Sequence, residues 1–426
     1  MFYLIETKDQ LSKLKEKLPF NQYTYLEYIQ GNDNTHPALA EVIAVYLNVE
    51  NKGYIIPINH PECINWDKDA VFSILSNYEF KIYDKKAALH LNPQLSYTDI
   101  QHQTPLQTQH TTQAHTWYYR KFPHTKVNKM IPIGKHLERC NSKYNEIIDS
   151  PHVINTYFDN KLLPALYRLE KNALKFNSKF DEYFKLKCKK FSVKENHIYG
   201  WYNPYTTTGR PVNNFNGINF VGLKHDNGER DCFEPDNDFF VEMDYDGYHP
   251  RLIGDIVGYR FHSNVHNELA QIYFKSKEIT PQQYKESKTL TFKQIYGGID
   301  RANLHHPFFR KTQDFINIIW EEFNKKGKII CGGYEIKKEN HPKIHSQKLF
   351  NYYIQATETY TNVEKINEIQ DYLENKKTKL VLYIYDAFIF DVSKQDGKQT
   401  LVDLQNILSE KFPIKVKVGK HYGALS

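Results

Sequence analysis

Two carboxylate-bearing segments of the sequence could hold metal ions. Asp244 follows the apolar run 239–243, and Asp386 stands between the apolar runs 380–384 and 388–392. These patterns predict one aspartate at the C-terminal tip of a strand and the other at the turn of a hairpin. Neighbouring strand-tip carboxylates suit a pair of Mg²⁺ ions, one activating a hydroxyl group and the other neutralising a leaving pyrophosphate. A single aspartate at a strand end is more often a turn or cap residue, so the hypothesis depends on further motifs.

The segment between the two aspartates carries helix signals at both ends. Thr280 suits the N-cap, Pro281 the first turn, and Gln283 completes a capping box. Gly297 and Gly298 follow the last residues of the pattern, as is typical of a helix C-terminus. The sequence therefore predicts a helix with well-defined boundaries.

One face of this helix offers a cation and two rings. Lys288, Phe292 and Tyr296 recur at four-residue spacing, so their side chains share a face. An ammonium group suits a triphosphate, and aromatic rings suit a base and a sugar. The alternative is an exposed lysine beside two aromatic core residues.

The order of these segments resembles that of the family A DNA polymerases. Asp244-Tyr245 followed by Arg251 resembles the first catalytic motif, and Tyr385-Asp386 stands where the family has His-Asp. Three further matches lie at similar separations. They are Thr206 to Arg210 beside the primer terminus, Lys288 to Gly297 in the fingers helix, and Asn351 and Gln355 in the template-strand helix. The resemblance extends from about Tyr199 to the C-terminus.

The resemblance implies an α+β fold of the right-hand type, with an antiparallel palm sheet, helical fingers and a reduced thumb, preceded by a small α/β exonuclease-like domain. It implies template-directed extension of a primer 3′-hydroxyl with dNTPs through two Mg²⁺ ions, for which Mn²⁺ can substitute. Asp244 and Asp386 are the implied metal ligands, together with the backbone carbonyl of Tyr245. Lys288 is the implied catalytic cation.

The resemblance also implies two sets of binding residues. Those expected to contact the nucleotide are Lys288, Phe292, Tyr296, His266, His249 and Lys285. Those expected to contact primer and template are Arg210, Thr208, Gly297, Asn351, Gln355, Lys187 and Lys190. The last two lie in a lysine-rich stretch that is read either as a solvated helix face or as a grip on a phosphate backbone.

Three positions depart from the family pattern. His249 replaces the glutamate that blocks a ribose 2′-hydroxyl, so sugar selection is expected to be relaxed or achieved differently, and the use of ribonucleotides stays open. Tyr284 replaces a triphosphate-binding arginine, and the neighbouring Lys285 points about 100° away around the helix. Ala387 replaces an auxiliary acidic residue. A phenylalanine at position 292 implies discrimination against dideoxynucleotides.

We expect four parts along the chain: a degenerate exonuclease-like domain over 1–95, a linker or loop over 96–125, a reduced thumb over 126–198, and palm and fingers over 199–426, with the fingers at about 256–325. The N-terminal domain is expected to lack proofreading, because the first carboxylate pair of such exonucleases is reduced here to Glu27. Glu27 and Asp84 are then predicted to be ordinary surface acids.

Composition adds weaker constraints. The chain has 426 residues and a formal net charge of +6, which is compatible with a polyanionic partner. Five scattered cysteines indicate a reducing compartment and no structural zinc. With no signal-type or membrane-spanning run, we expect a soluble cytoplasmic monomer that binds primer-template DNA and dNTPs. Because the expected thumb is short, we expect low processivity unless a processivity or replisome partner assists. Its Lys-, Asn- and Tyr-rich composition suggests a phage or another AT-rich replicon.

Two alternatives stay open. A single-subunit RNA polymerase would share the two aspartates, Lys288 and Tyr296, and His249 favours it, whereas Phe292 and the short chain do not. A catalytically inactive nucleic-acid binding protein would keep the fold, but binding alone does not require both carboxylates.

Overall fold

The computed structural model is a mixed α+β structure that divides into two compact units. The first comprises Met1–Tyr205 and Val212–Gly222, and the second comprises Thr206–Pro211 and Leu223–Ser426. The structure describes residues 2–18, 24–31, 36–100, 129–148, 155–177, 193–213, 218–224 and 228–425.

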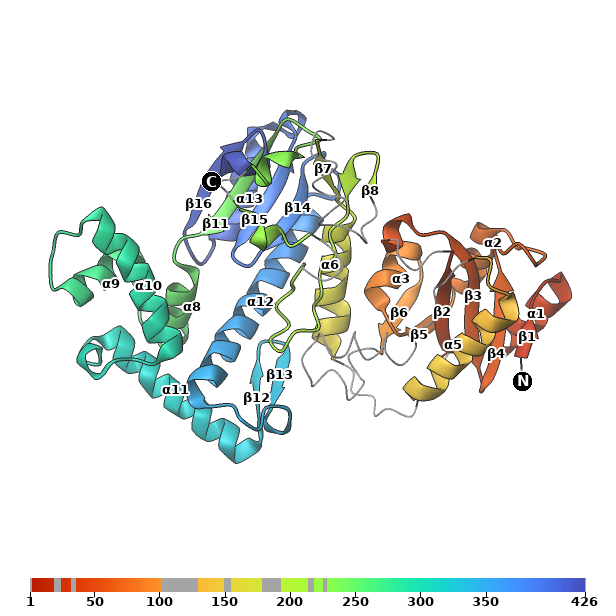
Figure 1. Cartoon of the computed structure of the whole chain (residues 1–426), viewed down its shortest axis with the longest axis horizontal. Helices are drawn as coiled ribbons and strands as arrows, with labels where there is room; N and C mark the ends of the chain where they lie inside the picture. The colour runs from red at the N-terminus through yellow and green to blue at the C-terminus, as the bar shows by residue number, and fades with distance from the viewer. Residues whose placement is uncertain are drawn as a thin grey trace. The chain divides into compact units, whose positions relative to one another are not determined.

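The first unit contains a six-stranded mixed sheet (Figure 1). The central strands β2 and β3 are buried along almost their whole length, and β3 is a nearly continuous apolar run. Strands β2, β3 and β4 pair antiparallel, and the outer pairings are parallel. In sheet order the strands are β1 (Phe2–Leu4), β4 (Lys52–Pro57), β3 (Val42–Val49), β2 (Thr24–Gln30), β5 (Glu79–Ile82) and β6 (Ser96–Asp99).

Helices cover both faces of this sheet, because the side chains of β3 alternate between two apolar cores. Val45 and Leu47 belong to one core, which helices α1, α2 and α3 complete, and Tyr46 belongs to the other, which helix α5 completes. Helix α6 packs against α3. The helices are α1 (Lys8–Lys17), α2 (Lys68–Leu75), α3 (Lys85–Leu91), α5 (Ile133–Ile148) and α6 (Leu163–Glu170), which follows a π-helical turn (Phe158–Leu162).

The expected boundaries differ from this arrangement at two places. Residues Ser96–Asp99, which begin the predicted linker, form the paired strand β6, and the remainder of that linker lies mostly outside the described residues. Helix α5, which the sequence placed in the reduced thumb, packs on strands β2, β3 and β4 of the N-terminal sheet. Its apolar residues recur at helical spacing and face that sheet. The spacing predicts a helix with one apolar face but does not say which part of the protein that face packs against.

The prediction that Glu27 and Asp84 are surface acids is wrong. Glu27 is buried on β2, with Lys143 of α5 at 3.1 Å and Arg139 at 3.8 Å from the same carboxylate oxygen. Burial alone would raise the pKa of Glu27, but these two cations hold it below its usual range. Asp84 is half-buried and caps α3 by accepting a hydrogen bond from the Ala87 amide.

Short elements complete both units. In the first, strands β7 (Leu174–Phe176), β9 (His197–Ile198) and β8 (Val193–Lys194) pair antiparallel in that order. Strand β10 (Phe233–Glu234) belongs to the second unit. Single 3₁₀ turns cover Pro37–Leu39, Phe220–Gly222, Arg230–Cys232, Arg301–Asn303, Lys338–Asn340, Lys394–Asp396 and Tyr422–Leu425.

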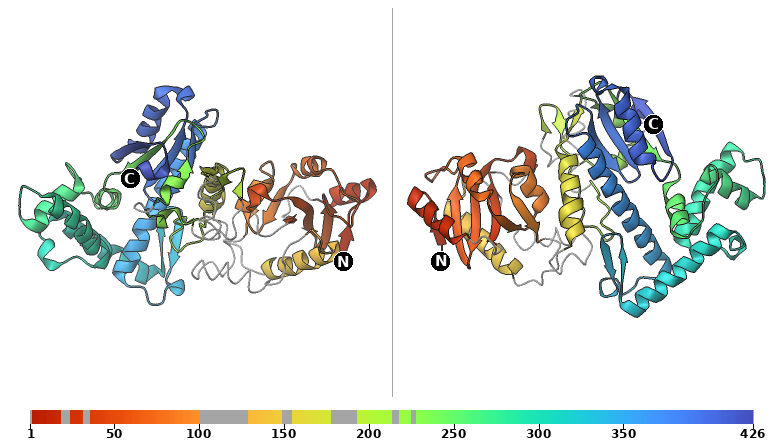
Figure 2. Two further views of the ribbon diagram at one scale, coloured as in Figure 1. Left: turned by 45° about the horizontal axis from the view of Figure 1, so that its top comes forward. Right: turned by 180° about the vertical axis from the view of Figure 1, so that it is seen from behind.

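The second unit is built on a four-stranded antiparallel sheet. Strand β11 lies between β15 and β16, and β14 forms the outer edge beside β15. Helices α12 and α13 pack against this sheet, as the view from behind in Figure 2 shows. The sheet strands are β14 (Lys379–Ile384), β15 (Ala387–Val392), β11 (Phe239–Tyr245) and β16 (Ile414–Gly419).

A helical region extends from the end of β11. Helix α12 contacts α8, α10 and α11 as well as α13 and β14, so it connects the sheet to this region (Figure 1). The helices are α8 (Tyr248–Ile256), α9 (Val265–Phe274), α10 (Pro281–Gly297), α11 (Pro307–Lys326), α12 (Ser346–Tyr372) and α13 (Gly397–Ser409), and a hairpin joins β12 (Lys328–Cys331) to β13 (Tyr334–Lys337). Within the described part of the chain, no helix combines the length and apolar character needed to cross a membrane.

Candidate active site

The strand predicted to present Asp244 is confirmed. Asp244 is the penultimate residue of β11, where it pairs with Ala387 on one side and Lys415 on the other. The chain then turns through Gly247, whose φ of +66° is strained for any residue with a side chain. A Cβ atom there would also lie 3.2 Å from Val265. This tight turn ends the strand at the carboxylate and starts α8.

The predicted hairpin is confirmed as well. Tyr385 and Asp386 form the two-residue connection between β14 and β15, and Tyr385 adopts a left-handed φ of +59°. The amide of Asn362 on α12 holds this turn by donating to the Tyr385 carbonyl at 2.8 Å and to the Tyr383 hydroxyl at 3.1 Å. The Tyr245 amide donates to the Asp386 carbonyl at 3.3 Å, so the ends of the two strands are directly joined.

The two aspartates form a site of concentrated negative charge. Burial, followed by the charges of Asp386 and Glu242, raises the pKa of Asp244 to about 7. Burial and the charge of Glu358 raise the pKa of Asp386. A divalent cation between the carboxylates would relieve this repulsion, and carboxylate oxygens are the ligands that Mg²⁺ prefers. The two carboxylates therefore fit a metal site, and the third predicted ligand, the carbonyl of Tyr245, belongs to the residue that directly follows Asp244.

The helix predicted from capping signals is confirmed as α10. Thr280 and Gln283 form both hydrogen bonds of the capping box, and Gly298 ends the helix with a φ of +123°. Gly297 is its last residue and is exposed. Because these signals are local, the sequence alone located both ends of the element.

The first part of the α10 face gathers groups suited to an anion. The Lys288 ammonium is exposed and lies 4.9 Å from the ring centre of Tyr284. The buried His266 ring of α9 meets Tyr284 edge-on at 5.9 Å. Burial and the charge of Lys288 lower the pKa of His266 to about 4, so this imidazole is neutral at physiological pH. Lys285 is exposed at a different angle around α10.

The second part of that face forms an aromatic corner, which consists of His249, Phe292 and Tyr296. Phe292 and Tyr296 stack at 6.1 Å, and the His249 ring stands edge-on to them at 6.4 and 5.8 Å. The Tyr296 hydroxyl lies 2.5 Å from Nδ1 of His249. Phe292 is 42% exposed, so one ring of the corner is open to a ligand.

Four residues predicted to contact primer and template are brought together. The Thr208 hydroxyl donates to the Gln355 side chain at 3.4 Å, and the Gln355 amide donates to Asn351 at 2.8 Å. Arg210 stacks on the Tyr385 ring, with its guanidinium carbon 3.6 Å from the ring centre. Lys187 and Lys190, assigned to the same role, lie outside the described residues.

Sequence reasoning missed Glu358, a fully buried residue of α12. Its carboxylate pairs with Arg210 at 3.0 Å and faces Nε2 of His249 at 3.2 Å. The available signal was its position: Asn351, Gln355 and Glu358 follow one another at spacings of four and three, which places them on one helix face. That face continues to Asn362, so α12 carries a polar stripe through an otherwise apolar interior.

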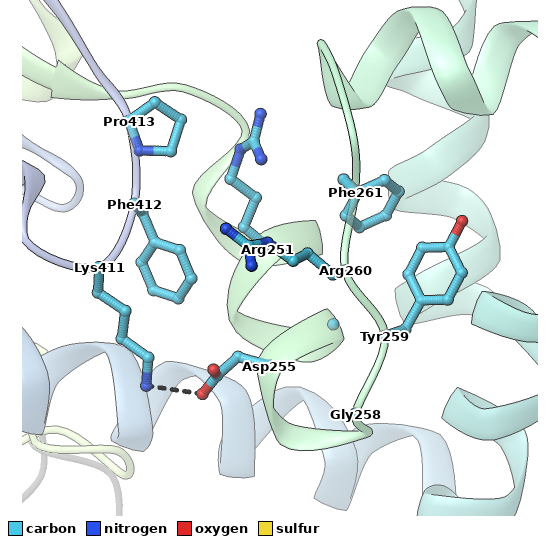
Figure 3. Close-up of a pocket in the computed structure, with 10 residues that line it drawn as sticks. Arg251, Asp255, Gly258, Tyr259, Arg260, Phe261, Lys411, Phe412 and Pro413 are labelled. Carbon is cyan, nitrogen blue, oxygen red and sulfur yellow. Dashed lines mark ion pairs between the residues drawn. The ribbon is translucent and has the colours of Figure 1, made fainter.

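A pocket of about 420 Å³ lies beside α8 and is drawn in Figure 3. Arg251, Arg260 and Lys411 line it together with Tyr259, Phe261 and Phe412. Lys411 is paired with Asp255 at 2.6 Å. Arg251 belongs both to the lining of the pocket and to the surroundings of the carboxylate site. It donates to the Asp246 carbonyl at 2.8 Å and to the Ser263 carbonyl at 2.9 Å. These bonds fix the turn that follows Asp244.

The first unit contains one further cluster of metal-ligand types among its described residues. Atoms of His36, His90 and Glu170 lie within 4.8 Å of one another. The buried Lys86 ammonium, however, is 2.5 Å from the Glu170 carboxylate and 3.0 Å from the ring centre of Trp201. Burial lowers the pKa of both His36 and His90 to about 3. A protein cation already neutralises the acid, so this is an internal ion pair.

Comparison with known proteins shows the fold. No family model and no curated protein matches the sequence. A solved structure, described as the POL domain of Pol1 from M. smegmatis in complex with DNA primer-template and dNTP, matches with a TM-score of 0.71. The match covers 100% of both chains at 12% sequence identity. The chain therefore shares the fold of this polymerase domain although the two sequences have little identity.

Proposed function

We propose that the chain is a template-directed DNA polymerase that extends a primer 3′-hydroxyl with dNTPs. The observation that carries the proposal is the pair of carboxylates, Asp244 and Asp386, on joined strand ends. The raised pKa values of both carboxyl groups, at Asp244 partly through the charge of Asp386, support a site prepared for divalent cations. The likeness of the fold to a polymerase domain solved with primer-template and dNTP supports the same function.

Each group of side chains then has a role. Mg²⁺ held by Asp244, Asp386 and the Tyr245 carbonyl would supply positive charge at the reacting phosphate. Lys288 and the neutral His266 bind the triphosphate, and the aromatic corner holds the sugar and base. Arg210, Thr208, Gly297, Asn351 and Gln355 orient primer and template. Lys285 is a peripheral cation of the same region.

Primer extension tests the proposal. The protein is incubated with a labelled primer on DNA and RNA templates, with Mg²⁺ or Mn²⁺ and with dNTPs or rNTPs in separate reactions. Extension templated by DNA with dNTPs is expected, and Asp386→Asn should abolish it while primer-template affinity is retained. Preference for rNTPs would favour an RNA polymerase instead. Binding without any extension would favour an inactive nucleic-acid binding protein.

A further inference from the structure

Glu358 lies between the residues assigned to the primer and those assigned to the nucleotide. It is fully buried, and the two groups that face its carboxylate come from different segments: Arg210 precedes β11, whereas His249 lies on α8. Arg210 in turn stacks on Tyr385, the neighbour of Asp386. A buried carboxylate is stable only when charged or hydrogen-bonded partners offset its desolvation, and here those partners are also residues of the candidate site.

His249 has a close neighbour at each ring nitrogen. Its Nε2 lies 3.2 Å from the Glu358 carboxylate, and its Nδ1 shares a 2.5 Å hydrogen bond with the Tyr296 hydroxyl. The carboxylate oxygen that faces Nε2 is buried and has no hydrogen-bond partner among the described residues, so its contact with the ring is a close approach of acid and imidazole. The ring therefore lies between α12 and α10 and forms one wall of the aromatic corner.

The order of groups along α10 suggests where the sugar of a nucleotide would lie. If Lys288 binds the triphosphate, as in the proposed function, a nucleotide that extends along the same face of α10 would bring its sugar towards the far end of the helix. Phe292 and Tyr296 lie there, and the His249 ring stands edge-on to both. A ribose 2′-hydroxyl would meet a ring that is hydrogen-bonded to Tyr296 and backed by the Glu358 carboxylate.

We propose that Glu358 is the positioning residue for sugar selection: by holding His249 against Tyr296, it keeps the aromatic corner too narrow for a ribonucleotide. This inference rests on the proposed polymerase function. In this arrangement the carboxylate of Glu358 comes from α12, and His249, the side chain that would block a ribose 2′-hydroxyl, comes from α8. Glu358 also pairs with Arg210, which stacks on Tyr385 in the hairpin that bears Asp386. The same carboxylate therefore contacts both the aromatic corner and a residue that packs on this hairpin.

The test is a comparison of kcat/KM for single dNTP and rNTP incorporation opposite the same template base. Glu358→Ala removes the acceptor and should lower the preference for dNTP at least about tenfold, the range expected when a pocket loses one steric contact. Glu358→Gln keeps an acceptor oxygen and should retain most of the preference. Glu368→Gln, an exposed glutamate of the same helix paired with Lys365 at 2.9 Å, is the matched control and should leave the preference unchanged.

A double-mutant cycle shows whether Glu358 acts through the histidine. His249→Ala should lower the preference as strongly as Glu358→Ala, and the double variant should lower it no further. Additive losses would overturn the proposal, as would an unchanged preference in Glu358→Ala while dNTP incorporation continues. Thermal unfolding of each variant separates these results from misfolding, and Glu358→Met, which removes the carboxylate but keeps a side chain of similar length, provides the test if the alanine variant unfolds. Failure of the unmodified protein to extend any primer would instead contradict the proposed function.

Discussion

The Asn362 side-chain amide donates a 2.8 Å hydrogen bond to the carbonyl oxygen of Tyr385, the residue that precedes Asp386. Asn362 is fully buried, and its own carbonyl accepts from the Tyr248 hydroxyl at 2.8 Å. One side chain of α12 therefore holds both the left-handed turn of the hairpin and the first turn of α8. The hairpin that carries Asp386 and the helix that follows Asp244 in the chain therefore share this support.

Replacing Asn362 with alanine should reduce both stability and activity. Buried partners on Tyr385 and Tyr248 would lose their hydrogen bonds, at a cost of about 1–3 kcal/mol in the free energy of unfolding. Asp386 would also lose its fixed position, so kcat should fall more than the affinity for primer-template. Urea unfolding and primer extension measure the two effects. Asn324→Ala, at an exposed position of α11, is the control, and an equal loss there would contradict this role for Asn362.

Replacing Asp244 with asparagine should abolish extension yet stabilise the protein in EDTA at pH 8. The amide removes a carboxylate whose pKa is raised to about 7 by burial and by Asp386 and Glu242. The gain should be about 1–2 kcal/mol, less than the full pKa shift would give, because Asp244 is partly open to solvent. Thermal unfolding with and without Mg²⁺ measures it. Asp314→Asn, at an exposed position of α11, should change neither property, and a destabilised Asp244→Asn would refute the charge argument.

Lys288 and Lys285 provide a matched pair on α10. Lys288→Ala should raise KM for dNTP by about tenfold or more, since a charge-assisted contact to phosphate contributes about 1.5–3 kcal/mol. Lys285→Ala should change KM by no more than about twofold, because its side chain leaves the helix at a different angle. Steady-state incorporation of a single nucleotide measures both. Equal effects of the two variants would mean that the triphosphate does not bind along the Lys288 face.

The buried histidines of the first unit should make its stability depend on pH. His36 and His90 have pKa values lowered to about 3 by burial, whereas an unfolded histidine titrates near 6.5. Below pH 6.5 the unfolded state binds protons that the folded state excludes. Stability is therefore complete above this pH and is lost as the pH falls towards 3, by up to about 1.4 kcal/mol per pH unit for each histidine.

Glu170 has the opposite effect on the pH dependence of stability. Burial raises its pKa, so the folded state binds this proton at a higher pH than the unfolded state does, and acid stabilises the fold through this group. Urea unfolding at pH 7.5, 6.0 and 5.0 should nevertheless show a decline, and His90→Gln should flatten it. His262→Gln, at an exposed position, should leave the slope unchanged. A slope that is independent of His90 would show that other groups control the acid response.

The protein should lack proofreading. Lys143 and Arg139 already neutralise the Glu27 carboxylate, so the site offers a metal ion no free acid at that position. A primer with a mismatched 3′ end should remain intact in Mg²⁺ without dNTPs, as judged by gel analysis. The Asp386→Asn variant serves as a control, since any shortening by it would come from a site other than the polymerase site. Rapid release of terminal nucleotides would contradict the prediction.

The sequence by itself determined the elements whose signals are local. The capping box and terminal glycines located α10, short apolar runs located the strands that present Asp244 and Asp386, and i to i+4 spacing placed Lys288 on the same face as Phe292. Each of these features depends on residues within one or two turns of one another. Local propensity is therefore sufficient to predict them.

The tertiary structure alone decided which distant residues meet. Arg210 and Glu358, separated by 148 positions, form an ion pair, and His249 completes the contact from a third segment. Glu27 was expected at the surface but is buried under α5, a helix that follows it by about a hundred residues. Such pairings depend on how whole elements pack, and a buried charge keeps its position only when that packing brings it a partner.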